Sequence, residues 1–509
     1  MIDVSRFRLL PFKHQIIGIE KLLENSFFFL ADEMGAGKTK QTIDAAQILY
    51  EKNVINKVLI LAPNSVKSVW FDPTLGELSK NLWLDLFSTV QEFHARNRKW
   101  DWKPEGTFNR IPLEWCITNY EFIRSKNRLE QLLPFCSQKT LLICDESSSI
   151  KSHRAEQTKA TLQIRKLCGR VVLLNGTPIA NSPMDMFSQG QILDPKILSC
   201  KSYFHFRGRY AIMGGWQNKQ IIQYQNLEDL QARFKPFVLR RLKKDCLDLP
   251  KSLPPITLTV TLSEATWKIY KEMRDDMVAW LSDSTVASAS QAAVKSMRLA
   301  QITSGFLGGI EEMPDEDTDI DNPPIATIQE IGREKLDFLI AWHKDRLIED
   351  LNLKLVVSCR FIPELARFLK VQQQEFPTQA VGCCAGKSLL GLGKKVEREQ
   401  VLRFLDPRTT PPGQVTVGMT YGTGGLGHNF TASHTMVNMS SDYAPWRYEQ
   451  AAARLDRPGQ VVPVSYFDIV AEGPKGQKTI DHIIVKARRN KEEINSWTTA
   501  AWIRALTEE

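Results

Sequence analysis

Residues 27–50 constrain the fold more strongly than any other stretch of this 509-residue chain. An apolar run from Phe27 to Leu30 leads into the glycine-rich sequence ADEMGAGKT at 31–39, and a helix-like stretch from Thr42 to Tyr50 follows. A buried strand that turns sharply into a helix aims several backbone N–H groups, and the positive end of the helix, at one spot. The segment therefore predicts a loop that binds a polyphosphate.

The side chains of this loop suit a nucleotide. Lys38 is expected to reach the β- and γ-phosphates, and the Thr39 hydroxyl to hold a magnesium ion. The usual pattern has a glycine five residues before the Gly-Lys pair, where this chain has Asp32. A chance glycine-rich turn is the alternative, but the setting between a strand and a helix favours the nucleotide. The loop residues expected to bind ATP are Gly35, Ala36, Gly37, Lys38 and Thr39.

A pair of acids follows a second apolar run. Residues 141–144 are wholly apolar and stop at Asp145 and Glu146; such a run is typical of a parallel strand buried on both faces. Ligands of open α/β sheets lie beyond the carboxyl ends of the strands. We therefore expect Asp145 to hold magnesium through water, and Glu146 to orient or deprotonate an attacking water. An ordinary solvated acidic turn is the alternative, and the loop at 35–39 favours nucleotide hydrolysis instead.

Length and composition limit the class of protein. A chain of 509 residues is too long for one hydrophobic core, which predicts roughly two to four domains. The net charge of +8 permits a nucleic-acid partner without requiring one. The nine cysteines show no paired metal-ligand spacing, which predicts reduced thiols. Residues 1–12 lack the apolar core of a signal peptide, and no apolar run reaches about 18 residues. We therefore expect a cytoplasmic protein with no membrane partner.

Strand-like apolar runs alternate with longer amphipathic stretches twice along the chain. This alternation predicts an α/β fold with two doubly wound parallel sheets. The stretches 183–250 and 262–305 are expected to be mostly helical, with a proline-punctuated linker at 249–255. The expected strands are 27–31, 58–62, 115–118, 141–144 and 171–174 in the first sheet, and 354–358, 380–384, 415–419, 435–439 and 464–470 in the second.

Two charged stretches have no assigned chemistry. Residues 311–321 carry seven acids and no lysine or arginine, which predicts a solvated loop. Arg488, Arg489 and Lys491 form a basic cluster on a predicted helix, where either a solvated helix face or a phosphate contact would account for them.

A nucleotide loop in only the first of two sheets suggests paired RecA-like lobes, and the order of short motifs points to a family. The first lobe carries LPFKHQ at 10–15, DEMGAGKT at 32–39, LILAPNSVKSVW at 59–70, ITNYE at 117–121, DESSSIKS at 145–152, LNGTPIANSP at 174–183 and FVLRRLKKDCLDLP at 237–250. The second carries TYGTGGLGHNFTAS at 420–433 and QAAARLDRPGQ at 450–460. From about residue 7 to residue 485 the chain resembles the Swi/Snf-related, helicase-like ATPases of superfamily two. RLAQITSGF at 298–306, and the absence of appended modules, are more similar to compact phage or bacterial members.

The resemblance has departures. Ser147 and Ser148 follow the acidic pair, where the family usually has a small residue and a histidine that helps couple ATP to DNA. Asp456 replaces a common histidine, Asn175 a threonine and Tyr443 a tryptophan. None of these changes removes a group needed for hydrolysis.

The resemblance implies a domain layout. Residues 1–250 would form the first RecA-like lobe, with a helical insertion at about 183–245. Residues 256–485 would form the second lobe, with a helical region at about 262–340, and residues 486–509 a C-terminal helical tail.

The resemblance also implies functional residues. Lys38, Asp145 and Glu146 would be catalytic, and Arg454 and Arg457 would reach the γ-phosphate from the second lobe when the lobes close. Further ATP contacts would come from Gln15, which reads adenine in the family, and from Gly427, Asn429 and Gln460. Contacts with the DNA backbone, blind to sequence, would come from Lys67, Thr118, Asn119, Tyr120, Ser358, Arg360, Gly386, Lys387, Thr420 and Thr423.

These residues imply a DNA-dependent ATPase that uses ATP and Mg²⁺ to translocate along duplex DNA and to remodel DNA-bound proteins or branched DNA. A strand-separating or branch-migrating DNA helicase is the first alternative, and an RNA helicase would be favoured by strong RNA stimulation. A DNA clamp with a degenerate ATPase is disfavoured because Lys38, Glu146 and Arg457 are all present.

Overall fold

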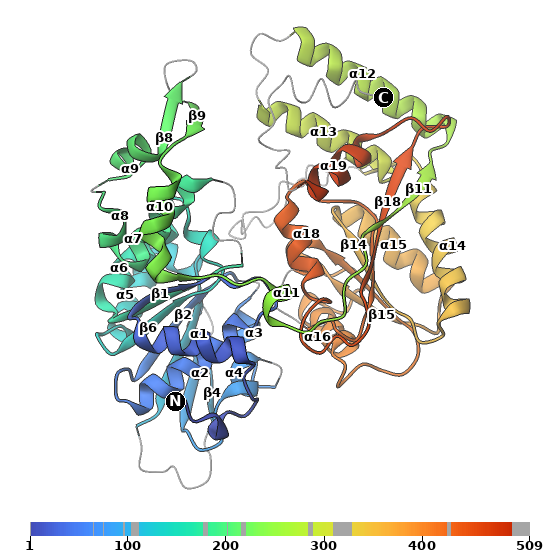
Figure 1. Cartoon of the computed structure of the whole chain (residues 1–509). Helices are drawn as coiled ribbons and strands as arrows, with labels where there is room; N and C mark the ends of the chain where they lie inside the picture. The colour runs from blue at the N-terminus through green and yellow to red at the C-terminus, as the bar shows by residue number, and fades with distance from the viewer. Residues whose placement is uncertain are drawn as a thin grey trace. The chain divides into compact units, whose positions relative to one another are not determined.

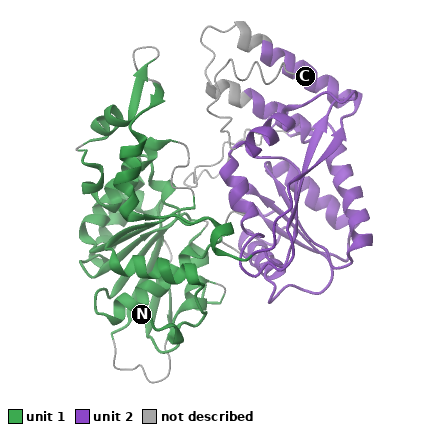
Figure 2. Ribbon diagram, in the orientation of Figure 1, with its two compact units in different colours: residues 1–248 green, residues 249–509 purple. Residues whose placement is uncertain are grey.

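The computed structural model describes residues 2–64, 66–74, 76–94, 97–102, 111–176, 182–200, 202–214, 220–283, 289–308, 328–424 and 429–490. The chain divides into two compact units, Met1–Asp248 and Leu249–Glu509 (Figure 2). None of the described helices combines the length and the apolarity needed to cross a membrane.

Unit 1 is built on an eight-stranded sheet in the order β10-β1-β7-β6-β2-β5-β3-β4 (Figure 1). All neighbouring strands are parallel except the antiparallel pair β3 and β4 at one edge. The strands are β1 (Phe27–Leu30), β2 (Lys57–Ala62), β3 (Ser88–Glu92), β4 (Arg98–Trp102), β5 (Leu113–Asn119), β6 (Thr140–Cys144), β7 (Arg170–Leu174) and β10 (Val238–Leu239).

Alternating residues of these strands enter two separate cores, because successive side chains of a strand point to opposite faces. Phe28 and Leu30 belong to one core, which α1 to α4 cover, whereas Phe29 belongs to the other, which α5 to α10 cover. The helices are α1 (Lys13–Glu24), α2 (Lys38–Glu51), α3 (Lys67–Phe71), α4 (Glu77–Asn81), α5 (Lys126–Leu132), α6 (Glu156–Leu167), α7 (Met186–Leu193), α8 (Pro195–Leu198), α9 (Tyr203–Tyr210), α10 (Leu227–Phe234) and α11 (Lys243–Cys246).

Unit 2 contains a six-stranded, wholly parallel sheet in the order β11-β18-β17-β14-β16-β15. Helices cover both faces of this sheet as well (Figure 1). The strands are β11 (Ile256–Thr261), β14 (Lys354–Cys359), β15 (Ala380–Cys384), β16 (Val415–Thr420), β17 (Thr435–Asn438) and β18 (Ser465–Glu472). The helices are α12 (Glu264–Asp283), α13 (Ala289–Thr303), α14 (Glu334–Glu349), α15 (Ile362–Glu375), α16 (Lys394–Leu405), α17 (Tyr421–Gly424), α18 (Pro445–Ala452) and α19 (Ile480–Arg489), with β12 (Phe306–Leu307) and β13 (Gln329–Glu330) forming a small antiparallel pair.

The two sheets confirm the predicted α/β class, and each predicted strand coincides with an observed one within a few residues. Helices make up most of the described residues of 183–250, as predicted, but the prediction missed the strands within this stretch. Strands β8 (Ala211–Gly214) and β9 (Gln220–Tyr224) form an antiparallel hairpin there, and β10 joins the main sheet. The hairpin extends away from the sheet (Figure 1), and Ile222 is 64% exposed on it.

Within the basic cluster at the end of α19, Arg488 is neither on a solvated face nor free for a phosphate, whereas Arg489 is exposed. Arg488 is buried, and its guanidinium donates to Asp468 at 2.5 Å and to Ser441 at 3.0 Å. Arg489 also donates to Asp468, at 3.0 Å. Both arginines therefore hold α19 on the edge of the unit 2 sheet. Lys491 and the acidic stretch 311–321 lie outside the described residues.

Candidate functional site

The loop between β1 and α2 takes the backbone shape expected of an anion-binding loop. Gly35 and Gly37 have φ angles of 88° and 80°, in the left-handed region that favours glycine. Gly37 is the N-cap of α2, and Lys38 is the first helical residue. The N-terminus of a helix presents the N–H groups of its first turn, and the positive end of its dipole, to an anion.

Two side chains of helix α1 hold this loop through hydrogen bonds. His14 Nε2 donates to the carbonyl oxygen of Ala36 at 2.9 Å, and the Gln15 amide donates to the same oxygen at 3.3 Å. A Cβ atom on Gly37 would lie 2.2 Å from the Gln15 amide nitrogen, so a side chain there would displace Gln15. Gln15, predicted to read adenine, thus also shapes the loop.

Lys38 and Thr39 lie at the mouth of the loop. The Lys38 ammonium donates to the carbonyl oxygens of Asp32, at 2.8 Å, and Glu33, at 3.4 Å. Thr39 is half-buried on the first turn of α2. An ammonium, a hydroxyl and the amides of a helix N-terminus, all within a few residues of one another, are groups that suit a polyphosphate.

The acidic pair lies at the carboxyl end of β6. Parallel strand order β1-β7-β6 brings the ends of β1 and β6 to the same edge of the sheet, about 10 Å apart at two strand spacings. Asp145 Oδ2 accepts a hydrogen bond from the Trp70 indole at 2.7 Å, and Tyr120 donates to the Asp145 carbonyl oxygen at 2.8 Å. The Trp70 bond orients the Asp145 carboxylate, and the Tyr120 bond holds the backbone of the same residue.

Glu146 has a backbone conformation unusual for its residue type. Its φ of 47° lies in the left-handed region, which strains a residue with a Cβ. The following residue, Ser147, donates from its hydroxyl to Gln189 Oε1 at 2.8 Å, and both side chains are buried. Ser147 thereby ties the acidic loop to α7.

The donor set at this edge fits a magnesium nucleotide. Thr39 and Asp145 offer oxygen ligands, as Mg²⁺ prefers, and such a site usually completes its shell with phosphate oxygens and water. Across the part of the chain that the structure describes, no group of three or more His, Cys, Asp or Glu could hold a metal by itself. The residues present therefore fit a metal that arrives with its nucleotide.

The segment that carries Arg454 and Arg457 follows α18 in unit 2. Gln460 orders this segment from within: its amide donates to the carbonyl oxygens of Ser433, at 2.9 Å, and Leu455, at 3.3 Å. Arg454 is buried and Arg457 half-buried. Asn429 is half-buried, and Gly427 lies outside the described residues.

Several predicted DNA contacts of unit 1 lie inside the unit. The Lys67 ammonium pairs with Glu92 at 3.1 Å, and burial lowers the pKa of Lys67 while Glu92 opposes that change. Thr118 and Tyr120 are fully buried, and Asn119 donates to Glu121 at 2.9 Å. These contacts are structural, and the DNA contacts of the four residues stay predictions.

Among the residues of unit 2 that are predicted to contact DNA, some are buried and others are exposed. Ser358 is buried and donates to Asn438 at 2.6 Å, and the Arg360 guanidinium lies 3.6 Å from the centre of the Tyr443 ring. Gly386 and Lys387 are exposed, and their DNA contacts stay predictions. Thr420 is buried at the end of β16, and the side chain of Thr423 lies outside the described residues.

Sequence reasoning missed four residues that organise the site: His14, Trp70, Asp32 as an acceptor, and Arg241. Trp70 and Arg241 stood within quoted motifs, but a motif gives no partner. Trp70 lies 75 positions from Asp145, and Arg241 lies 209 positions from Asp32. Only the folded chain brings these pairs together.

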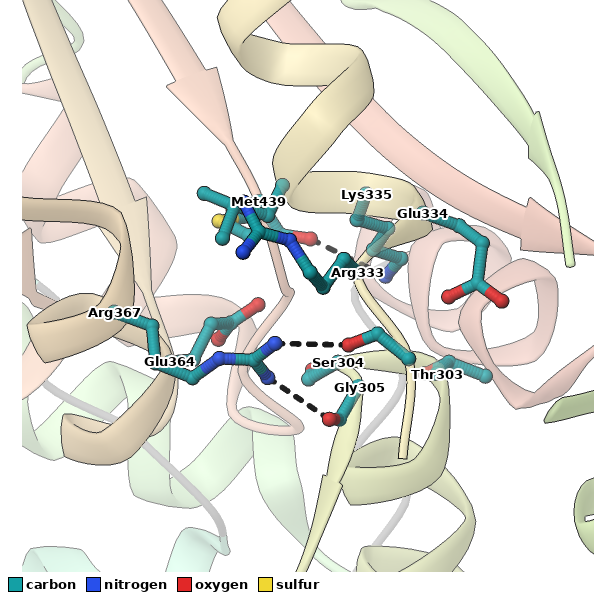
Figure 3. Close-up of a pocket in the computed structure, with 11 residues that line it drawn as sticks. Thr303, Ser304, Gly305, Arg333, Glu334, Lys335, Glu364, Arg367 and Met439 are labelled. Carbon is teal, nitrogen blue, oxygen red and sulfur yellow. Dashed lines mark hydrogen bonds between the residues drawn. The ribbon is translucent and has the colours of Figure 1, made fainter. Parts of the chain in front are cut away.

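A second polar cluster lies in a small pocket of unit 2 (Figure 3), and none of the predicted site residues lines this pocket. Lys335 forms a buried ion pair with Asp481 at 2.5 Å, and Arg367 donates to the carbonyl oxygens of Gly305 and Gly332 at 2.8 and 2.9 Å. Glu364 accepts a hydrogen bond from Ser440. The cluster joins α13, α14, α15 and α19, which is a structural role.

Comparisons with known proteins agree with this geometry. The family model described as the SNF2-related domain matches residues 19–306. The probable ATP-dependent DNA helicase CHR12 of Arabidopsis thaliana is 26% identical over 489 residues, covering 92% of this chain and 39% of that protein. The human SWI/SNF-related matrix-associated actin-dependent regulator of chromatin subfamily A member 1 is 24% identical over 475 residues, covering 90% of this chain and 41% of that protein. The chain thus spans about two-fifths of the length of these curated relatives.

One solved structure covers the whole chain. The SWI2/SNF2 ATPase core of Sulfolobus solfataricus in complex with dsDNA aligns with 100% of this chain and 99% of its own, at 20% identity and a TM-score of 0.41.

Glu364 predicts a pH dependence of stability. Burial raises the pKa of Glu364 to about 7 from an ordinary 4.5, while Lys335 and the Ser440 hydroxyl oppose the rise and Asp481 adds to it. The folded chain then binds more protons than the unfolded chain between these values, so the free energy of unfolding falls as pH rises through that window. Relative to the wild type, the free energy of unfolding of Glu364→Gln should rise by roughly 2–3 kcal/mol from pH 5 to pH 8, measured by urea unfolding.

The control is Glu349→Gln, an exposed glutamate of α14 in the same unit. Its free energy of unfolding should change with pH as that of the wild type does. If Glu364→Gln also follows the wild type, the raised pKa of Glu364 is contradicted.

Proposed function

The chain belongs to the SNF2-related family of helicase-like ATPases, and we propose that it hydrolyses ATP to move along duplex DNA. The observation that carries the proposal is the loop at 35–39, shaped by left-handed glycines and held from α1, at the same sheet edge as Asp145 and Glu146. An ATP hydrolase requires both a phosphate-binding loop and acidic groups that act on the metal and on the attacking water.

In the proposed reaction the residues of unit 1 bind and orient. The backbone N–H groups of 35–39 and the Lys38 ammonium cradle the β- and γ-phosphates, for which Lys38 must leave the Asp32 and Glu33 carbonyl oxygens. Bound Mg²⁺ would neutralise phosphate charge beside Thr39 and Asp145. Glu146 orients the attacking water and accepts its proton.

Arg454 and Arg457 complete the site in this proposal when the two units close. A guanidinium at the γ-phosphate stabilises charge that develops in the transition state. Closure is then linked to bound ATP, and opening to hydrolysis and release. If each unit grips a phosphodiester backbone, repeated cycles move the chain along DNA.

The grip on DNA would rely on contacts that are blind to sequence. Lys387 and Gly386 are exposed already, whereas Lys67 would exchange Glu92 for a phosphate. Duplex DNA, and proteins bound to it, are the proposed partners. The relatives named as helicases and chromatin regulators support this choice.

A strand-separating helicase is the second candidate, because the exposed β8–β9 hairpin is a feature that such enzymes can use as a wedge. Displacement of a triplex strand without unwinding of a forked duplex would support the translocase. Efficient unwinding of the fork would support the helicase instead.

The first test of function is ATP turnover with and without nucleic acid. Duplex DNA should stimulate turnover at least as well as single strands. Lys38→Ala or Glu146→Gln should abolish turnover and leave DNA binding largely intact, because Lys38 contacts phosphate and Glu146 the attacking water. Lys52→Ala, at the exposed far end of α2, is the control and should keep full turnover. Strong stimulation by RNA alone would indicate an RNA helicase, and turnover retained in both variants would remove the assigned site.

Arg457→Ala should lower kcat by roughly 10³-fold or more with near-normal affinity for ATP, because an arginine finger acts on the transition state. Steady-state turnover and nucleotide binding measure the two effects separately. Arg403→Ala, an exposed arginine of α16 in the same unit, should change neither. An equally large loss of ATP affinity in Arg457→Ala would indicate a ground-state role.

Trp70→Phe keeps an aromatic ring at this position, although a smaller one, and removes the N–H that orients Asp145. Since partners that orient a ligand carboxylate influence metal affinity by about 10- to 100-fold, the Mg²⁺ concentration for half-maximal turnover should rise about tenfold. Trp100→Phe removes a similar bond, to the Phe71 carbonyl oxygen at 2.7 Å, and serves as the control. An equal Mg²⁺ requirement in all three proteins would show that Trp70 only packs.

A further inference from the structure

Asp32 stands where a phosphate loop commonly has glycine, and it is completely buried. Its carboxylate forms a two-pronged ion pair with Arg241: Nε lies 2.9 Å from Oδ1, and Nη2 lies 2.5 Å from Oδ2. Planar arginine matches a carboxylate in this two-bond geometry, which lysine cannot reproduce. The negative charge that Asp32 brings to an anion-binding loop is therefore neutralised by one specific partner.

Arg241 also contacts the elements on either side of the loop. Its guanidinium donates to the carbonyl oxygen of His14 on α1 and, at 3.1 Å, to Gln41 Oε1 on α2. The Gln41 amide in turn donates to Asp32 Oδ2 at 3.3 Å. A Cβ atom on Gly18 would lie 1.8 Å from Gln41 Oε1, so α1 approaches this cluster as closely as its glycine allows.

Backbone hydrogen bonds join the same two segments. Ala31 N–H donates to the Leu239 carbonyl oxygen at 2.8 Å, and Glu33 N–H donates to the Arg241 carbonyl oxygen at 2.9 Å. The Lys243 N–H donates to the Glu33 carboxylate at 2.7 Å. The start of the phosphate loop is thus paired with residues 239–243, and unit 1 ends at residue 248.

We propose that Asp32 and Arg241 are positioning residues of the nucleotide site, which fix the phosphate loop to the segment that leads out of unit 1. The inference deepens the proposed function, since it assigns the loop to a nucleotide. Arg241 directs the Asp32 carboxylate away from the phosphates, while the Asp32 carbonyl oxygen receives Lys38. Any shift of the loop on nucleotide binding is passed directly to the connection between the units.

Loss of Arg241 has a specific electrostatic consequence. Without Arg241, the Asp32 carboxylate loses its positively charged partner. The Lys38 ammonium is close by, because it already donates to the backbone carbonyl oxygen of Asp32. A buried charge attracts an opposite charge strongly, so the carboxylate competes with phosphate for Lys38. A second change, Asp32→Asn, removes that competitor.

The test is binding of a fluorescent ADP analogue with Mg²⁺ to the full chain, at a temperature where circular dichroism shows every variant folded. Arg241→Ala should raise the Kd at least tenfold, which is 1.4 kcal/mol, and Arg241→Lys should raise it less. Arg240→Ala, the exposed neighbour, should bind as the wild type does. The double variant Asp32→Asn/Arg241→Ala should bind several-fold more tightly than Arg241→Ala.

A purely structural role would lower the melting temperature of Arg241→Ala without changing the Kd of the folded protein, and that result would overturn the proposal. If Arg241→Ala does not fold, the Kd of Arg241→Lys is compared with the Kd of Arg240→Lys. A higher Kd for Arg241→Lys supports the proposal, and equal values overturn it. The readout is binding and not hydrolysis. A wild type that binds no nucleotide would therefore overturn the proposed function as well, whereas wild-type binding with an unchanged Arg241 variant overturns this inference alone.

Discussion

The phosphate loop cannot hold itself in the shape that binds an anion, and the rest of the structure depends on how it is held. Backbone N–H groups that bind one anion must converge on it, which a short peptide segment does not do by itself. Here His14 and Gln15 hold the Ala36 carbonyl oxygen on one side. Arg241 holds Asp32 on the other. The site is therefore assembled from three separate parts of the sequence.

Contacts from separate parts of the sequence also hold the acidic loop at Asp145. Trp70 shares α3 with Lys67, a predicted DNA contact, and Tyr120 is itself a predicted DNA contact, yet the polar atoms of Trp70 and Tyr120 contact Asp145. The Trp70 bond reaches the Asp145 carboxylate, and the Tyr120 bond reaches its backbone carbonyl oxygen. Under the proposed function, these two hydrogen bonds would connect bound DNA to the hydrolytic residues within unit 1.

The sequence was informative where the chemistry is contiguous. Wholly apolar runs such as 141–144 predicted the buried strands, because parallel strands covered on both faces carry no alternation. The loop at 35–39 and the pair at 145–146 were recognisable for the same reason, as all their residues are neighbours in the chain. Strand β4, which is partly exposed, and strand β10, only two residues long, gave no such signal.

Contacts over long sequence separations could not be predicted. Nothing in the sequence around Lys67 or Arg488 shows that Glu92 and Asp468 neutralise them, so both looked available to phosphate. The hairpin β8–β9 was missed because its strands are short and its apolar residues are partly exposed, which lacks the pattern of a buried strand. Basic residues in a sequence therefore mark a DNA surface only after their internal partners are known.

The central claim is that one nucleotide is held by groups from both units. A structure of the chain with DNA, Mg²⁺-ADP and aluminium fluoride, which imitates the transferred phosphoryl group, tests it most directly. The account predicts that the Lys38 ammonium and a guanidinium of Arg454 or Arg457 lie within about 3 Å of the fluoride atoms, at hydrogen-bond distance. A structure in which Lys38 makes this contact while both guanidinium groups face solvent would contradict it.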